Sequence, residues 1–218
     1  MTIAHHIPED ILIAYSSGSL SEAWSLVVAT HLALCPDCRA TVSVIDDVGG
    51  TLLEMIEQTE TDEQAFDRLM RAIDDLPMDD VQPASAKRSV PAILPEPLIS
   101  YLGSDLHALK WRRLGKGVFH IPITTGDTGV KARMLKVPAG RPVPMHGHKG
   151  NELTIVLVGA FHTHQGMFER GDVEVADGSI EHMPVAAPGE DCICLAVTDA
   201  PLRFRSIAAR VVQKFIGI

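Results

Sequence analysis

Three residues with metal-binding side chains, His31, Cys35 and Cys38, stand close together in one stretch of the sequence. His31 and Cys35 are four residues apart, which on a helix places their side chains on one face, one turn apart. Pro36 follows Cys35 directly and predicts that one helix ends there and another begins. Thiolate and imidazole are ligands that zinc prefers in closed tetrahedral sites. The stretch therefore predicts a zinc site that lacks only its fourth ligand.

The fourth ligand is expected from a histidine pair near the N-terminus, just before Pro8. Either His5 or His6 can complete a Cys2His2 site. The predicted set is His6, His31, Cys35 and Cys38, with His5 as the alternative to His6. The competing interpretations are a surface histidine with a pair of free thiols at a helix start, and a redox-active Cys-x-x-Cys pair. The helical spacing of His31 favours a metal.

An N-terminal histidine followed by His31-x3-Cys35-x2-Cys38 resembles the motif of the zinc-binding anti-sigma domain. The order of features along nearly the whole chain, including the second metal motif described next, resembles the ChrR type of zinc-binding anti-sigma factor. The resemblance implies a protein that binds an ECF (group IV) sigma factor and holds it away from RNA polymerase. It also implies release of the sigma factor on an oxidative signal, either singlet oxygen or an organic peroxide.

The second metal motif places two histidines and a glutamate around the start of a predicted strand. His146 and His148 are two residues apart, so on extended chain both side chains face the same way, and Glu152 opens the next strand within reach of the same point. Two imidazoles and a carboxylate suit a divalent metal, and this ligand set does not choose between Zn, Mn, Fe and Ni.

The spacing Gly140-x5-His146-x-His148-x3-Glu152-x6-Gly159 resembles the first motif of the cupin family. That resemblance implies an all-β barrel and a second motif with a fourth ligand, which identifies His182 as the candidate. Asp177, Ser179 and Ala186 stand where the second cupin motif usually has proline, glycine and asparagine, so the local turn is expected to differ from the family pattern.

Four further residues with reactive side chains lie in the second half of the chain. His162 and His164 alternate on a predicted strand, but no cupin position requires them, so they are expected to line the barrel or face the surface. Cys192 and Cys194 are expected with Cα atoms about 6.6 Å apart on one strand, which disfavours a disulfide between them. They are predicted to be buried apolar residues or possible redox thiols near the metal.

The hydrophobic pattern predicts an α + β fold of two domains. Helical periods predict a small zinc-binding helical bundle over residues 1–82, with helices at 8–18, 19–34, 36–58 and 61–76. A proline-containing linker is predicted at 83–97, so that the domains pivot with modest contacts. Strand-like alternation and regularly spaced glycines predict an all-β cupin domain, a sandwich or barrel, over 98–218. Spacings typical of a capping box begin at Ser19 and at Thr61.

Apolar residues at helical spacing in 61–76 form one stripe that is either packed in its own domain or free to bind a partner. The partner-binding candidates are Phe66, Leu69, Met70 and Ile73.

Charge is distributed unevenly along the chain. Residues 1–82 carry 16 Asp and Glu against 3 Lys and Arg, whereas the remainder carries 12 against 16. An acidic surface attracts basic proteins and repels phosphate, which argues against direct binding of nucleic acid. Neither a signal peptide nor a membrane-spanning segment is recognisable, so a cytoplasmic protein is expected.

Two functional classes fit these observations. The leading hypothesis is a non-enzymatic anti-sigma factor with no catalytic residues, whose cupin domain senses an oxidative signal through its metal. The alternative is a cupin metalloenzyme, dioxygenase-like, with the helical region as a regulatory or oligomerisation domain. An enzyme has no need of a strongly acidic helical domain with its own zinc site, which favours the first.

Overall fold

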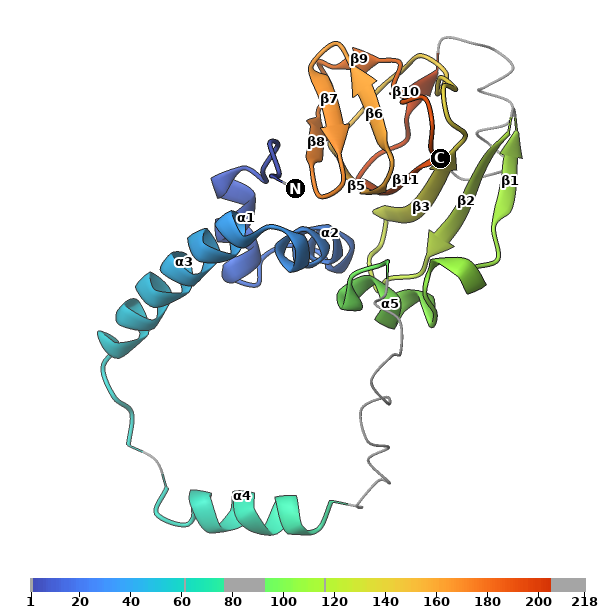
Figure 1. Cartoon of the computed structure of the whole chain (residues 1–218). Coiled ribbons are helices and arrows are strands. Elements are labelled where there is room, and N and C mark those ends of the chain that lie inside the picture. The colour runs from blue at the N-terminus through green and yellow to red at the C-terminus, as the bar shows by residue number, and fades with distance from the viewer. Residues whose placement is uncertain (1, 61, 77–92, 116, 205–218) are drawn as a thin grey trace.

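Helices in the first half of the chain and a β-barrel in the second are the two parts of the structure (Figure 1). It is a computed structural model that describes residues 2–60, 62–76, 93–115 and 117–204. The predicted fold class, helices followed by a β-rich cupin domain, is confirmed. Within the described residues, no helix is both long and apolar enough to cross a membrane.

The four predicted helices form and are slightly shorter than expected, and two further short helices, at 96–102 and 106–108, were not predicted. They are α1 (Glu9–Ser16), α2 (Glu22–Leu34), α3 (Pro36–Glu54), α4 (Ala65–Asp74), α5 (Glu96–Leu102) and the 3-10 helix η1 (Leu106–Ala108). Pro36 is the first residue of α3, where its missing N–H costs no hydrogen bond. Because α2 ends at Leu34 and α3 begins at Pro36, the break between them lies inside the predicted ligand set. The Cys35 Sγ atom accepts a hydrogen bond from the Cys38 N–H across this break.

The capping box predicted at Ser19 does not form. The Ser19 hydroxyl instead donates to the Ala14 carbonyl, and Ser21 precedes α2 without a side-chain cap. Asp127, in the loop after the second strand of the barrel, accepts hydrogen bonds from the N–H groups of Glu22 at 3.0 Å and Ala23 at 2.7 Å. A carboxylate more than one hundred residues away therefore caps α2, and sequence spacing cannot reveal such a cap. Thr61, the start of the other predicted box, lies outside the described residues.

Twelve strands are described in the second half of the chain. They are β1 (Arg112–Gly115), β2 (Val118–Ile123), β3 (Lys131–Val137), β4 (His146–Gly147), β5 (Glu152–Val158), β6 (Ala160–Thr163), β7 (Gly166–Glu169), β8 (Val173–Ala176), β9 (Glu181–His182), β10 (Val185–Ala186), β11 (Cys192–Thr198) and β12 (Arg203–Phe204). A six-stranded sheet has the order β1-β2-β3-β11-β5-β8, and two three-stranded sheets have the orders β10-β6-β7 and β12-β4-β9. The strand pairs among the described residues are antiparallel, and the short β4–β9 pair sets His146 directly opposite His182.

One hydrophobic core runs from the helices into the barrel. Its members come from the arm and α1, from α2, from the segment that ends in α5, and from the strands: Ile7, Leu12, Ala23, Leu26, Val27, Val28, Leu32, Leu94, Leu98, Ile99, Met134, Leu153, Ile155, Leu195 and Val197. The expectation of two pivoting domains with modest contacts is therefore wrong, because α2 buries its apolar face against α5 and the barrel.

The predicted linker ends earlier than expected. Residues 83–92 lie outside the described part of the chain, but Leu94 is buried and α5 begins at Glu96. The Asp105 carboxylate accepts hydrogen bonds from the N–H groups of Ile93 and Leu94. This segment is therefore attached to the barrel, and the proline content alone did not predict that attachment.

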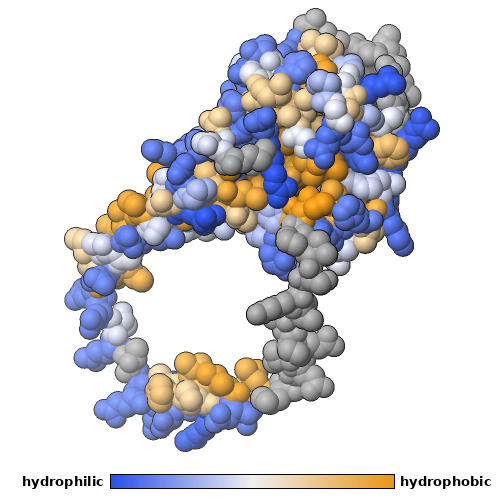
Figure 2. All heavy atoms as spheres, viewed as in Figure 1, coloured by the Kyte–Doolittle hydropathy of each residue, from blue (hydrophilic) through white to orange (hydrophobic). Residues whose placement is uncertain are grey.

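Helix α4 is different from the other helices because none of its residues is buried. It stands apart from the rest of the chain in Figure 1, and its apolar residues gather on one side of the helix in Figure 2. The last turn of α3 likewise exposes the apolar side chains of Leu52 and Leu53, and Ile56 just after the helix is also exposed. Exposed apolar surface on two neighbouring helices is typical of a protein-binding surface.

Candidate metal centres

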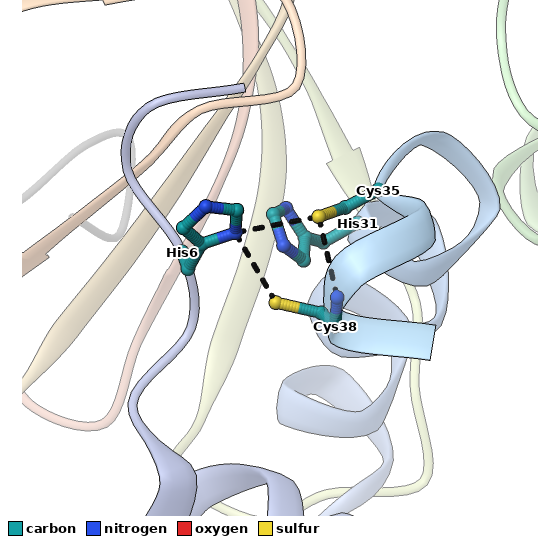
Figure 3. Close-up of side chains that lie close together, drawn as sticks. All are labelled: His6, His31, Cys35 and Cys38. Atoms are coloured by element: carbon teal, nitrogen blue, oxygen red, sulfur yellow. Dashed lines mark hydrogen bonds between the residues drawn. The ribbon is translucent and has the colours of Figure 1, made fainter. Parts of the chain in front are cut away.

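Four ligand atoms meet where the N-terminal arm crosses the junction of α2 and α3. They belong to His6 on the arm, His31 in the last turn of α2, and Cys35 and Cys38 around the break (Figure 3). The four atoms lie within 4.8 Å of one another, and His6 Nδ1 is 3.3 Å from Cys35 Sγ and 3.5 Å from Cys38 Sγ. The structure thus brings together the four residues predicted from the sequence, which we call the thiolate cluster.

His5, the alternative to His6, lies outside the thiolate cluster. Its ring packs at a tilt of 33° against Phe168, with 4.3 Å between the centroids, and its Nδ1 is 3.4 Å from Asp172 Oδ2. The two adjacent histidines therefore point to different partners, as expected for neighbouring residues on extended chain.

The hydrogen bond of His31 determines which of its nitrogens is available. His31 Nδ1 is 2.8 Å from the Gly171 carbonyl oxygen, which can only accept, so Nδ1 carries the proton and Nε2 has a free lone pair. That Nε2 is buried and has no hydrogen-bond partner among the described residues. Burial also lowers the pKa of His31, which keeps the ring neutral. A buried, unpaired lone pair directed at two thiols fits a metal cation.

The two thiols also fit a metal. Cys35 and Cys38 are buried, and burial raises the pKa of Cys38 to about 11. A bound cation favours the thiolate form, which the apolar surroundings alone disfavour. Two sulfur and two imidazole ligands form one of the common closed sets for structural zinc.

A second group of four ligand atoms lies inside the barrel. His146 is on β4, His148 follows it, Glu152 begins β5 and His182 ends β9; all four are buried, with ligand atoms within 4.8 Å of one another. His182 Nε2 is 3.0 Å from His146 Nε2 and 3.1 Å from His148 Nε2, and His148 Nδ1 is 3.8 Å from Glu152 Oε2. We call these four residues the barrel cluster, and they are the set predicted from the sequence.

Hydrogen bonds on the far side of two of these rings show that their Nε2 atoms are lone-pair donors. The Nδ1 of His146 donates to the Pro144 carbonyl at 2.8 Å, and that of His182 donates to the Glu174 carboxylate at 3.1 Å. Their Nε2 lone pairs therefore face each other at 3.0 Å, an arrangement in which neither atom supplies a proton. A cation between them resolves this conflict, so the barrel cluster fits a divalent metal.

Burial sets the protonation of the barrel cluster. It lowers the pKa of His146 and His148 to about 4, so both rings are neutral at physiological pH. It raises the pKa of Glu152 to about 7, opposed in part by His182 and by a hydrogen bond from the Thr154 hydroxyl. Neutral imidazoles and a carboxylate that is readily deprotonated next to a cation are suitable metal ligands.

The remaining candidates lie outside both clusters. His162 and His164 are exposed. Cys192 and Cys194 are buried free thiols on β11, and a hydrogen bond with Cys192, together with burial, raises the pKa of Cys194. A protonated, buried thiol is a weak nucleophile, so direct oxidation of Cys194 is disfavoured in this conformation.

Three residues that hold the ligands in place were not predicted from the sequence. Gly171 accepts from His31, Asp172 holds the N-terminal arm, and Glu174 accepts from His182. The available signal for Glu174 was its inward position on β8, where a charged side chain is rare unless it is paired. No local signal exists for Gly171 and Asp172, because their partners are at least 140 residues away.

The barrel with its His3Glu cluster and the helices with their Cys2His2 cluster define a cupin-like protein with two candidate metal sites, and comparisons with known proteins show its family. Residues 102–201 match the family described as the ChrR Cupin-like domain. The chain is 47% identical to Anti-sigma-E factor ChrR of Cereibacter sphaeroides over all 218 residues, the full length of both proteins. It is also similar to a chain in the crystal structure of Rhodobacter sphaeroides SigE in complex with the anti-sigma ChrR, with 44% identity and a TM-score of 0.79, covering 91% of this chain and 100% of that chain.

The chain therefore belongs to the ChrR family of anti-sigma factors. The family resemblance stated from the two motifs is confirmed. Of the two functional classes considered, the chain belongs to the regulators and not to the metalloenzymes.

Proposed function

We propose that this protein binds an ECF sigma factor through α3 and α4 and releases it when the barrel cluster responds to an oxidative signal. The observation that carries the proposal is full-length similarity to an anti-sigma factor of the same length. The related complex contains SigE, which makes a sigma factor the partner of this chain in the proposal. The proposed place of action is the cytoplasm, where RNA polymerase and its sigma factors work.

The exposed apolar surface of α3 and α4 supports this partner. On α4 the exposed large apolar residues are the four predicted candidates, Phe66, Leu69, Met70 and Ile73, and on α3 they include Val44, Val48, Leu52 and Leu53. An amphipathic helix that buries nothing in its own chain gains its stabilisation by laying the apolar face into a partner's groove. We therefore assign these two faces as the sigma-binding surface.

Charge supports the same partner. Residues 1–82 carry the excess of acidic side chains, and α4 is flanked by Asp67, Asp74 and Asp75 on its polar side. A sigma factor binds DNA phosphates and so presents basic surface. Acidic side chains around the apolar contact speed the association of such a partner and oppose the binding of nucleic acid to this chain.

The metals have different tasks in the proposal. Zinc at the thiolate cluster would be held by His6, His31, Cys35 and Cys38, and it would tie the arm, α2 and α3 together as a structural site. A divalent metal, Zn, Mn, Fe or Ni, at the barrel cluster would be held by three histidines and Glu152, and it would supply the chemistry that recognises singlet oxygen or an organic peroxide.

A transcription reporter driven by the cognate sigma factor tests the proposal. The full chain is expected to repress the reporter, and exposure to singlet oxygen or an organic peroxide is expected to relieve repression. His146→Ala and His182→Ala are expected to repress as well as the unmodified chain but to respond weakly, because they empty the barrel cluster without touching α3 or α4. His162→Ala, an exposed barrel histidine outside both clusters, is the matched control and should respond normally. A chain that does not repress, or barrel variants that respond fully, would contradict the proposal.

A further inference from the structure

Four consecutive buried residues at the start of β8, 171–174, lie between the two metal clusters. At one end the Gly171 carbonyl accepts the Nδ1–H of His31 at 2.8 Å. At the other end the Glu174 carboxylate accepts the Nδ1–H of His182 at 3.1 Å. These two anchors are three residues apart, about 10 Å along a strand. One short segment therefore orients a ligand of the thiolate cluster and a ligand of the barrel cluster.

Asp172, inside this segment, holds the N-terminal arm that carries the ligand His6. Its Oδ1 accepts hydrogen bonds from the N–H groups of Ala4 at 2.8 Å and His5 at 2.9 Å, and its Oδ2 accepts from Glu169 N–H at 2.8 Å. The Val173 N–H donates to the His5 carbonyl at 3.0 Å. The arm is thus attached to the barrel directly before His6, and two of the four thiolate-cluster ligands depend on residues 171–173.

Gly171 is required for this close approach. Its φ of 93° lies in the region that side chains rarely adopt, and a Cβ atom there would lie 2.5 Å from Ile3 Cδ1 on the arm. A side chain at residue 171 would therefore strain the backbone and displace the side chain of Ile3 at this contact.

The segment is also fixed within the barrel. Through β8 it pairs with β5, where Glu174 lies opposite Thr154 and Val173 opposite Ile155. Because β5 begins with the barrel ligand Glu152, the same strand pair carries a ligand of the barrel cluster and the carboxylate that orients another. A displacement of His182 is therefore transmitted to Glu174 and, along a rigid hydrogen-bonded strand, to the partners of His31 and the arm.

We propose that Gly171, Asp172 and Glu174 are positioning residues that couple the two metal clusters, so that loss of metal from the barrel loosens the thiolate cluster. The inference rests on the proposed function, since it requires that both clusters bind metal. It gives the oxidative signal a physical route from the barrel to the helices, through the segment 171–174 and without the capping contact of Asp127 on α2. A severalfold loss of affinity leaves a tightly held structural zinc in place, so chains with an emptied barrel cluster still repress.

Cobalt binding to the full-length chain measures this coupling. Co²⁺ bound to thiolates gives sulfur-to-metal charge-transfer absorption that the sulfur-free barrel cluster cannot give, so the thiolate cluster is titrated selectively in competition with a chelator. His148→Ala impairs the barrel cluster without altering any residue of 171–174. It is expected to weaken Co²⁺ binding at the thiolate cluster by about fivefold or more, the lower end of usual allosteric couplings.

Two variants interrupt the proposed route from opposite ends. In an Asp172→Ala chain, and in a Glu174→Ala chain, adding His148→Ala is expected to change the thiolate-cluster affinity less than twofold. Asp127→Ala is the matched control, because it removes another carboxylate that accepts backbone N–H groups between barrel and helices but lies at neither cluster. It should keep the full dependence on His148.

The outcomes separate the inference from the proposed function. Charge-transfer bands that are present but insensitive to His148→Ala, or a dependence that persists in both Asp172→Ala and Glu174→Ala, would overturn the coupling alone. Absence of charge-transfer bands from the unmodified chain would overturn the proposed zinc site and the coupling with it. The inference is supported if the dependence on His148 is lost in Asp172→Ala and in Glu174→Ala but kept in Asp127→Ala.

Discussion

Replacing Phe66 by alanine is expected to weaken binding of the sigma factor without destabilising the free protein. Phe66 is on α4, its side chain is 69% exposed, and no residue of that helix is buried. Truncation therefore removes no packing within the chain, so the free energy of unfolding is expected to stay within about 0.5 kcal/mol of the unmodified value.

The loss of affinity follows from the apolar area that the partner covers. Fully burying a phenylalanine side chain is worth about 1.5–3 kcal/mol. Since each 1.4 kcal/mol is about a factor of ten, Phe66→Ala is expected to raise the Kd by roughly 10- to 150-fold. Aromatic residues near the centre of an interface commonly account for effects of this size.

Calorimetric titration with the purified sigma factor measures the Kd, and thermal melting of the free chain measures its stability. Met167→Ala is the control, because Met167 is also an exposed apolar residue but lies on β7 of the barrel, and it should change neither quantity. A Phe66→Ala chain whose Kd stays within twofold would refute the assignment of α4 as a contact surface. A marked drop of its melting temperature would show instead that α4 packs within the free chain.

Three further outcomes are expected. Cys38→Ala should abolish zinc binding, lower the helical content measured by circular dichroism and prevent sigma binding, because structural zinc supplies on the order of 10 kcal/mol. Cys192→Ala, the control in the barrel, should retain zinc. A Cys38→Ala chain that stays helical and binds the sigma factor would refute a structural role of the zinc. Zinc must displace the proton that burial holds on Cys38, whose pKa is raised to about 11, and this proton alone makes the affinity measured by chelator competition rise about tenfold per pH unit between about pH 6 and about pH 8. Any further proton that the ligands release steepens the rise, and a flat profile would contradict the displacement. The rate of association with the sigma factor, followed by stopped-flow fluorescence, should fall as salt is added, whereas an unchanged rate would reduce the acidic charge to an aid to solubility.

The two ligand sets were predictable because each depends mainly on local spacing. The i, i+4 spacing of His31 and Cys35 places both on one face of a helix, and the i, i+2 spacing of His146 and His148 places both on one side of extended chain. The structure brings these residues together as the spacing requires. His182 came from resemblance to the cupin motif, since its ligand position depends on the pairing of β9 with β4.

The contacts between the helices and the barrel were not predictable in this way. The proline-rich composition before residue 97 indicated a linker, and the change from helical to alternating periodicity indicated two independent domains. Both signals describe only local sequence, and neither reports that Leu98 and the apolar face of α2 share one core. The shared core forms because α2 carries more apolar residues than one face of a small bundle can bury.

By itself the sequence determined the helical and β-rich halves, the class of metal ligand in each half and the acidic character of the first, because these follow from residue type and short-range periodicity. Only the tertiary structure decided that His6 and not His5 joins the thiolate cluster, that Asp127 caps α2, and that residues 171–174 contact both clusters. Each of these depends on hydrogen bonds between groups far apart in the chain, whose pairing is set by packing of the whole molecule and leaves no pattern in the local sequence.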